Sequence, residues 1–420
     1  MTSRRPSLPR RVAAALGPGV ITGAADDDPS GIATYSIAGA QLGTGLLWTA
    51  FLTWPLMAAV QMMCARIGMV TGRGLAGALR KKFPQPLLVA AAVALLAANA
   101  INIGADLAGM ADAAEMLTGV NSHIAVVAFA AAIMIATVRL RYAQIASVLK
   151  WLALALGAYV VTAFLVHPHW ATIARDAFVP SMPKGREAWA TLVAILGTTI
   201  SPYLFFWQAS QEVEEEKAMG RRMLVSRKGA TSREITDRRI DVGVGTFASN
   251  LVMFFVILTT ALTLHVHGTT EIRTTKEAAQ ALAPLAGKLA AALFTVGILG
   301  VGFLAIPTLA GSAAYAFAET FGWRQGLDQK LRGAKQFYLV AGLATAVGIG
   351  MDLARLNPVR TLFWSAVLNG ILAPFLLVGV LVVASDRTLM AHQPSSVASR
   401  VIVGLTTLLM FGAALGMFVF

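Results

Sequence analysis

The stretch "GAADDDPSGIATY", residues 23–35, places three consecutive aspartates beside a proline and a glycine within an apolar run. About 15 residues from Val12, or roughly 22 Å of helix, precede the acids, so they lie near the middle of a ~30 Å hydrocarbon core. An ionised carboxylate at that depth costs several kcal/mol unless it faces a cavity, a partner or an ion. The stretch therefore predicts a broken membrane helix with a functional site at its break.

The composition of the whole chain also indicates a membrane location. The 420 residues are 57% hydrophobic and 13% charged, with a mean hydropathy of +0.69. Apolar runs of about 20 residues recur from end to end, so we expect an all-helical integral membrane protein. Eleven spans are predicted, near residues 12–38, 44–70, 86–117, 122–138, 146–166, 187–211, 241–266, 281–319, 336–353, 359–384 and 399–420.

A second interruption lies in the sixth predicted span, "WATLVAILGTTISPYLFFWQAS" (189–210). Pro29 and Pro202 each remove a backbone donor and disfavour helical geometry in the preceding residue. The two breaks lie five spans apart in oppositely oriented helices, which indicates an inverted repeat around a substrate site. For either break alone, a proline kink filled by neighbouring hydroxyl groups is the alternative. We expect one domain over 1–420, with a first repeat at about 12–166, a second at about 187–384 and an extra helix at about 399–420.

The net charge of +13 is distributed as in a membrane protein and does not predict nucleic-acid binding. Most Lys and Arg residues lie in the N-terminal tail and in alternate loops, which predicts a cytoplasmic N-terminus and an external Phe420. The same basic stretches predict contacts with lipid headgroups, whereas no cofactor and no obligate protein partner are evident. We interpret the single cysteine, Cys64, as a small buried hydrophobic residue. "GRGLAG" (72–77) has the glycine spacing of a dinucleotide loop but follows a membrane helix instead of a strand.

The first break supplies a carboxylate and a carbonyl as candidate metal ligands. Asp28 is the best candidate because it immediately precedes Pro29, where the first half-helix has ended. The free carbonyls at that end favour a cation, and we expect the carbonyl of Ala25 to be among the ligands. Asp26 and Asp27 line the cytoplasmic approach in this interpretation; alternatively, one of the three acids stays protonated because three adjacent carboxylates repel one another.

The second break supplies hydroxyl groups. Thr198, Thr199 and Ser201 are candidate ligands, together with unpaired carbonyls near Thr198. The alternative for each hydroxyl is a hydrogen bond to the preceding turn of its own helix. Every candidate donor is oxygen, because neither break contains His, Cys or Met.

Few other polar residues fall inside the predicted spans. Asp106 lies in the third span, with Asn99 and Asn102 one or two helical turns before it. Asn369 lies in the tenth span. We expect Asn369 to be among the metal ligands, and Asp106 and Asn102 to line the ion pathway or act as a proton relay. The alternative is that these side chains join helices to one another.

These residues resemble a known family. "GPGVITGAADDDPSGIATYS" (17–36), "GLLWTAFLTWPLMAAVQMMCARIGMVTGRGL" (45–75) and "LGTTISPY" (196–203) look like the natural resistance-associated macrophage protein (Nramp) family of divalent-metal transporters. The resemblance covers essentially the whole chain. It implies the LeuT-type fold with eleven helices, and alternating access around a metal site made by helices one and six.

The chain departs from the family's transition-metal importers at the ligand positions. In helix one they carry Asp-Pro-Gly-Asn, and this chain has Gly31 at the position of the Asn. In helix six they carry Met-Pro-His, and this chain has Ser201 and Tyr203 at the positions of the Met and the His. The resemblance thus implies a larger and harder site, because an amide and a thioether are lost. Tyr203 replaces the histidine associated with proton movement, and tyrosine does not exchange protons usefully at neutral pH.

Helices three and ten show a mixed pattern. Asp106 matches the family's helix-three acid, but Gly109 stands where many members have a second acid. Ala366 aligns with a frequent glutamine of helix ten, and Asn369 is the nearest amide. This pattern is similar to the Nramp-related magnesium transporters more than to the iron and manganese importers.

The resemblance and the ligand chemistry together predict a secondary transporter that imports a hard divalent cation, Mg²⁺ first and Mn²⁺ second, without proton coupling. A proton-coupled importer of Mn²⁺ or a transition metal is the main alternative. An ion-coupled amino-acid carrier is disfavoured because three aspartates would repel a substrate carboxylate. An intramembrane protease is a weaker alternative that would pair Asp28 with Asp106, and we expect no enzyme.

Overall fold

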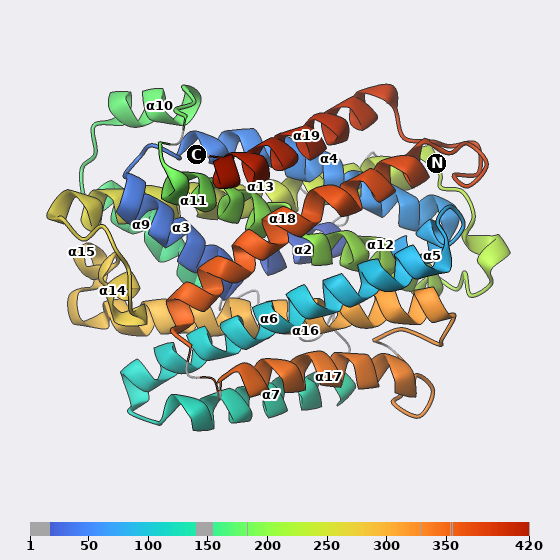
Figure 1. The fold of residues 1–420 in the computed structure, drawn as a ribbon, viewed down its shortest axis with the longest axis horizontal. Coiled ribbons are helices and arrows are strands. Elements are labelled where there is room, and N and C mark those ends of the chain that lie inside the picture. Colours follow the sequence, from blue (N-terminus) through green and yellow to red (C-terminus); the bar gives the residue numbers. More distant parts are fainter. Residues whose placement is uncertain are drawn as a thin grey trace, which may run out of the picture.

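The computed structural model describes residues 17–139, 154–182, 184–327, 329–352, 354 and 356–419. The basic N-terminal tail, the start of the first predicted span, residues 146–153 of the fifth and Phe420 lie outside these described residues. The described chain is helical throughout its regular elements (Figure 1).

The α-helices are, in chain order, α2 (Pro18–Asp26), α3 (Pro29–Leu42), α4 (Trp48–Thr71), α5 (Leu75–Leu79), α6 (Gln85–Thr118), α7 (Ser122–Arg139), α9 (Gly157–Leu165), α10 (Trp170–Phe178), α11 (Arg186–Thr199), α12 (Pro202–Ala218), α13 (Ser232–Thr263), α14 (Thr275–Gln280), α15 (Ala283–Ala286), α16 (Ala290–Phe321), α17 (Lys335–Asp352), α18 (Pro358–Ser385) and α19 (Val397–Val419). Short 3₁₀ turns accompany them: η1 (Leu154–Leu156), η2 (Leu224–Arg227), η3 (His265–His267) and η4 (Gly287–Leu289).

Both predicted breaks are confirmed. α2 ends at Asp26 and α3 begins at Pro29, while α11 ends at Thr199 and α12 begins at Pro202. Each proline occupies the first position of the second half-helix, where its missing N–H leaves no intrahelical bond unmade. The proline therefore starts one half-helix at the point where it stops the other.

Within the described residues, eight helical segments are long and apolar enough to cross a membrane. Most observed ends lie within a few residues of the predicted spans, with two exceptions. The segment between the predicted sixth and seventh spans is mostly helical, because α12 continues to Ala218 and α13 begins at Ser232. The eighth span starts at Ala290 instead of 281, because Gly287 takes a positive φ of 50° and interrupts the helix.

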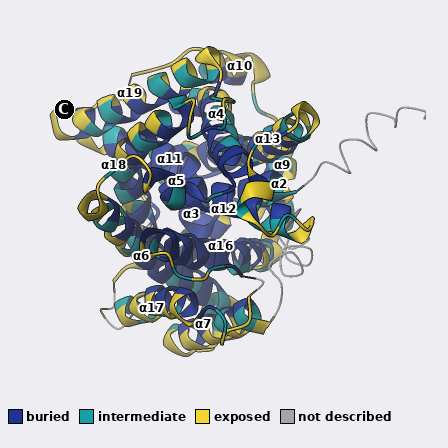
Figure 2. Ribbon diagram, turned by 90° about the vertical axis from the view of Figure 1, so that its right-hand side faces the viewer, coloured by how far each residue is buried: buried dark blue, intermediate teal, exposed yellow. Residues whose placement is uncertain are grey.

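The broken helices occupy the centre of the molecule. In Figure 1, α2, α3, α11 and α12 lie between α4 and α13 on one side and α6 and α16 on the other. In the most apolar 18-residue stretch of the α11–α12 segment, 94% is buried, whereas 28% is buried in that of α7. Figure 2 shows the same gradient, with buried residues gathered in the middle and exposed ones on the outer helices. A helix that is apolar on all sides and enclosed in this way belongs to the core of the protein.

Candidate metal site

Asp28 lies at the first break and caps the helix that follows it. Its backbone is extended, with φ −65° and ψ 169°, and its Oδ1 accepts hydrogen bonds of 2.7 Å from the N–H of Gly31 and the hydroxyl of Ser30. An aspartate at this position satisfies a free amide and places its charge at the positive end of the helix dipole. The cap fixes the direction of the carboxylate, so that Oδ2 points away from α3.

Asn102 joins this carboxylate to a second one. Its Nδ2 donates to Asp28 Oδ2 at 3.0 Å and to Asp106 Oδ2 at 3.1 Å, so one amide of α6 bridges both acids. All three side chains are buried. Three residues that the sequence singled out on two separate spans therefore meet in one hydrogen-bonded cluster.

Oxygen atoms from both breaks converge on the position beside Gly31 where a side chain would begin. A Cβ atom built at this residue would lie 3.1 Å from Thr198 Oγ1, 3.2 Å from the carbonyl oxygen of Asp26 and 3.4 Å from Asp28 Oδ1. A hydroxyl, a carbonyl and a carboxylate thus surround one point next to the glycine. Hard divalent cations prefer these oxygen donors, and a side chain larger than hydrogen at residue 31 would crowd them.

Several other oxygen atoms of the predicted site are buried without a hydrogen-bond partner among the described residues. They are Ser201 Oγ, Asn369 Oδ1, Asn102 Oδ1, Asp106 Oδ1 and Asp26 Oδ1. Ser201 precedes α12 as its cap residue yet makes no capping bond with its side chain. Buried polar atoms normally have a partner, so each of these oxygens is available to water or a cation. No hydrogen bond of the described chain joins Asn369 to the cluster at Asp28.

Tyr203 and Ala25 connect the two breaks in a way that the sequence did not predict. The Tyr203 hydroxyl donates to the Ala25 carbonyl at 2.9 Å. The carbonyl expected to bind the ion is therefore occupied by a hydrogen bond, although its second lone pair stays available. Tyr203 acts here as a link between α2 and α12.

Asp26 and Asp27 share a partner on α13. The Ser249 hydroxyl lies 2.7 Å from Asp26 Oδ2 and 3.2 Å from Asp27 Oδ1. Sequence reasoning missed Ser249, because one serine in a long apolar helix carries no signal of its own. Met253, one helical turn further, places its sulfur 3.7 Å from Thr199 Oγ1 and so brings a thioether close to the second break.

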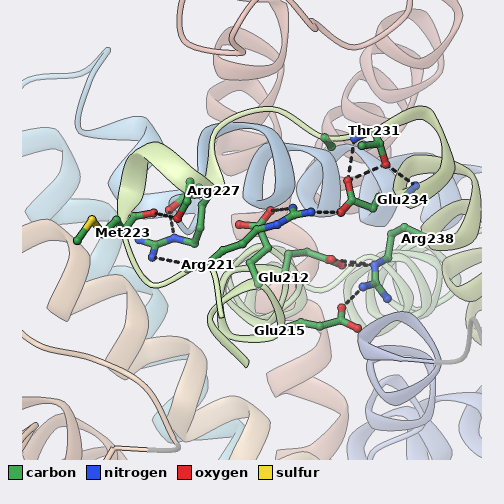
Figure 3. A network of polar contacts seen from close by, with 12 residues as sticks. Glu212, Glu215, Arg221, Met223, Arg227, Thr231, Glu234 and Arg238 are labelled. Carbon is green, nitrogen blue, oxygen red and sulfur yellow. Dashed lines mark hydrogen bonds and ion pairs between the residues drawn. The ribbon is translucent and has the colours of Figure 1, made fainter. Parts of the chain in front are cut away.

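One end of α2 is sealed by four charged residues, Glu212, Glu215, Arg238 and Asp241, which we call the inner cluster after the cytoplasmic side predicted for it. Arg238 forms ion pairs with Glu212, at 2.7 Å, and with Glu215 (Figure 3). It also pairs with Asp241 at 2.5 Å. Asp241 also accepts hydrogen bonds from three backbone N–H groups of the 17–20 segment. The cluster therefore ties α2, α12 and α13 together at this end.

Close backbone packing reinforces the inner cluster. A Cβ at Gly23 would lie 2.3 Å from the carbonyl oxygen of Gly245, and one at Gly245 would lie 2.3 Å from that of Gly19. Only glycines allow α2 and α13 to approach this closely. The opposite end is different, since a cavity of about 970 Å³ opens between α3, α11 and α18. It reaches inward to Ile37, Thr191 and Val367 and ends short of the breaks.

The central acids differ from a metal cage built of charged ligands. Among the described residues, no three or more His, Cys, Asp and Glu side chains form a group that could hold a metal ion. The arrangement instead offers carboxylates together with neutral hydroxyl, amide and carbonyl oxygens. Such a set suits a cation that passes through and keeps part of its water, more than one that stays.

Comparisons with known proteins cover nearly the whole chain. The family described as natural resistance-associated macrophage protein-like matches residues 19–420. A divalent metal cation transporter MntH from Yersinia pestis (strain Pestoides F) is 26% identical over 98% of this chain and 96% of its own length. One from Aeromonas hydrophila is 25% identical over 93% and 92%.

Solved structures show the same fold. A manganese transporter from Eremococcus coleocola aligns with a TM-score of 0.73 and 18% identity, over 99% of this chain and 88% of that one. MhsT in complex with L-phenylalanine aligns with a TM-score of 0.56 and 15% identity, over 94% of this chain and 98% of the other. The inward-facing conformation of Mhp1 aligns with a TM-score of 0.53. The predicted LeuT-type helical fold is thus confirmed.

Proposed function

The chain belongs to the natural resistance-associated macrophage protein-like family and is a divalent metal cation transporter, and we propose that it moves Mn²⁺ past the oxygen atoms that converge beside Gly31. The observation that carries this proposal is the convergence of Thr198 Oγ1, the Asp26 carbonyl and Asp28 Oδ1 on one point between the breaks. Mn²⁺ accepts carboxylate, carbonyl and water oxygens. We further propose that Ser201 supplies a hydroxyl, since its oxygen lacks a partner among the described residues.

Two observations favour Mn²⁺ over the magnesium branch expected from the sequence. The curated relatives are named divalent metal cation transporters, and a similar solved structure is a manganese transporter; neither name refers to magnesium. Met253 also brings a sulfur atom near the second break. Mg²⁺ stays as the second candidate, because the atoms around Gly31 are all oxygen.

We also propose that proton movement accompanies the metal, in contrast to the expectation from Tyr203. Asp26, Asp27, Asp28 and Asp106 are buried and form no ion pair with any described residue. Four ionised carboxylates without a counter-charge would be very costly in a membrane, so some hold protons when the metal is absent. An arriving dication favours the ionised forms and releases those protons.

The charge distribution supports an orientation with the inner cluster at the cytoplasmic face. In that orientation the structure has its outer cavity open and its cytoplasmic end sealed, which is one state of alternating access. We propose that the repeats at about 12–166 and 187–384 move relative to each other, with 399–420 outside the repeat. The alternative of an amino-acid carrier is supported only by the fold that this chain shares with MhsT. The acids at the first break would repel the carboxylate of an amino acid.

Reconstituted liposomes test the proposal. Purified protein is given Mn²⁺, Mg²⁺ or an amino acid under an inside-negative potential, with a pH-sensitive dye in the lumen. We expect Mn²⁺ uptake with acidification of the lumen, and loss of the acidification in Asp106→Asn. Mn²⁺ uptake without acidification would restore the proton-independent mechanism predicted from Tyr203, and uptake of Mg²⁺ alone would restore the magnesium assignment.

A further inference from the structure

A second polar pocket lies near the predicted cytoplasmic face, away from the broken helices, and we propose that it binds a phosphate-bearing anion. Its volume is about 460 Å³, within the ~300–1,000 Å³ that is usual for small-molecule sites. The ends of α4, α12 and α16 surround it together with α5. Five basic side chains and one acid line it: Arg73, Arg80, Lys81, Lys217, Arg227 and Glu319.

Three of these cations are available to a ligand. Arg73, Arg80 and Lys81 form no ion pair with any described residue, whereas Lys217 pairs with Glu214 at 2.7 Å. Arg80 extends over the end of α16, since a Cβ at Gly322 would lie 3.2 Å from its Nη1. Two guanidinium groups and one ammonium group around one cavity match the several oxygens of a phosphate.

A buried arginine forms the floor of the pocket. Arg227 is 9% exposed, and its guanidinium donates to the carbonyls of Gly72, Arg221 and Arg222 (Figure 3). These bonds fix the loop after α12 against the end of α4. The basic wall is therefore held in place by the fold before any ligand arrives, which lowers the entropic cost of binding.

The glycine-rich segment 72–77 has a different role from the one its spacing suggests. The N–H of Gly77 donates to Glu319 Oε2 at 2.8 Å, and a Cβ at Gly74 would lie 2.0 Å from Glu319 Oε1. Glu319 thus occupies the amides that a phosphate would use in a nucleotide-binding loop. The proposed anion is held by side chains at the rim of the pocket.

The position of the pocket favours a phospholipid headgroup as the source of the phosphate. Trp323 lines the pocket and stacks on Phe321, with ring centroids 5.0 Å apart, and Phe321 is 42% exposed. Exposed aromatic rings next to basic side chains are typical of the depth where lipid headgroups lie. A soluble phosphate compound is the other source of the same chemistry.

Thermal unfolding of the full chain in a neutral detergent tests this inference. The unfolding midpoint is titrated with short-chain phosphatidylglycerol, with phosphatidylcholine of the same chain length, or with pyrophosphate at constant ionic strength. We compare wild type with Arg80→Gln/Lys81→Gln and with the control Lys330→Gln/Arg332→Gln. The control removes the same charge from exposed residues nearby that do not line the pocket.

We expect phosphatidylglycerol to raise the midpoint and phosphatidylcholine to leave it unchanged. The pocket variant should weaken binding roughly 30-fold and the control less than about threefold. If pyrophosphate reproduces this pattern and the lipid does not, the pocket is confirmed and its ligand is soluble. The inference is overturned if neither anion raises the midpoint, or if both variants lose affinity equally. Unchanged midpoints without anion would show that both variants fold.

Discussion

Two groups of buried acids lie in this protein, and they differ in where their counter-charge comes from. In the inner cluster, Arg238 forms ion pairs with all three acids and is itself 8% exposed. The central acids at the first break and on α6 have only neutral partners among the described residues, such as Asn102 and Ser249. A buried carboxylate needs a cation or a proton. The inner cluster has its cation in the chain, whereas the central acids must obtain theirs from solution.

This difference separates a cluster that holds helices together from the acids that we propose to bind the metal ion. The ion pairs of the inner cluster stabilise the arrangement of α2, α12 and α13 that is present in this structure. Asp28 and Asp106 are held in position by the amide of Asn102, and Asp28 also by its cap of α3. Both carboxylates can still bind a cation or a proton. The following predictions test this contrast, beginning with the largest expected effect.

Removing the central charge should abolish transport. We expect Asp28→Asn and Asp28→Ala each to lower Mn²⁺ uptake roughly 100-fold or more in liposomes, because both remove a ligand charge. Only the alanine variant should also lose stability, by about 1 kcal/mol, because asparagine still caps α3. Asp112→Asn is the control, since Asp112 is a partly buried acid on α6 outside the cluster. Wild-type uptake by Asp28→Asn would remove Asp28 from the site.

Removing the inner cation should damage the fold more than the site. Arg238→Gln leaves Glu212 and Asp241 buried without their partner, and we expect a loss of about 3–5 kcal/mol of stability. Thermal unfolding in detergent measures this loss. Arg239→Gln is the matched control, because it removes the same charge from the exposed neighbouring position. Equal unfolding midpoints for the two variants would show that the inner cluster does not stabilise the arrangement of α2, α12 and α13.

Changing the ligands should alter which cation the central acids accept. Gly31→Asn with Ser201→Met adds an amide and a thioether, and we expect a roughly tenfold shift in uptake from Mg²⁺ toward Cd²⁺. The new amide must displace Thr198 slightly, given the 3.1 Å approach at residue 31. Ser201→Ala, which removes the hydroxyl without adding sulfur, should not produce the shift. Competition assays with unchanged selectivity would show that hydration, not these ligands, sets the preference.

Breaking the surface ion pair between Lys82 and Asp386 should have the smallest effect on stability, and that effect should depend on pH. The Leu389 N–H and then Lys82 lower the pKa of Asp386 below its usual value. Because the folded pKa is depressed, this stabilisation is present at neutral pH and is lost as the pH falls through the folded pKa. Lys82→Gln should cost about 0.2–1 kcal/mol at neutral pH and nothing in strong acid. Unfolding midpoints measured against pH check this, and an equal cost at both pH values would contradict it.

The two breaks could be predicted because their causes are local. Pro29 and Pro202 each act on their own helix and on the preceding residue, so their effect is visible in a short stretch of sequence. Asp28 could be proposed as a metal ligand for the same reason, because it is an acid predicted to lie near the middle of the membrane. Asp106 and Asn102, which the structure joins to Asp28 by hydrogen bonds, could be singled out because a polar residue is rare inside an apolar span.

The inner cluster was missed because charged residues near the end of a span resemble an ordinary solvated loop. Glu212 and Arg238 lie 26 residues apart in the sequence, and their 2.8 Å hydrogen bond exists only because α12 and α13 both extend beyond the predicted spans. The link from Tyr203 to the Ala25 carbonyl was missed for a similar reason, since its partners are 178 positions apart.

The sequence by itself determined which segments cross the membrane, where two of them break and which acids stand at the first break. These features follow from hydrophobicity, proline geometry and the cost of burying charge, all of which act over one or two helical turns. Only the tertiary structure decided which oxygens meet beside Gly31 and which acids receive Arg238. Those pairings depend on how distant helices pack, and a packing contact between remote residues has no local pattern in the sequence.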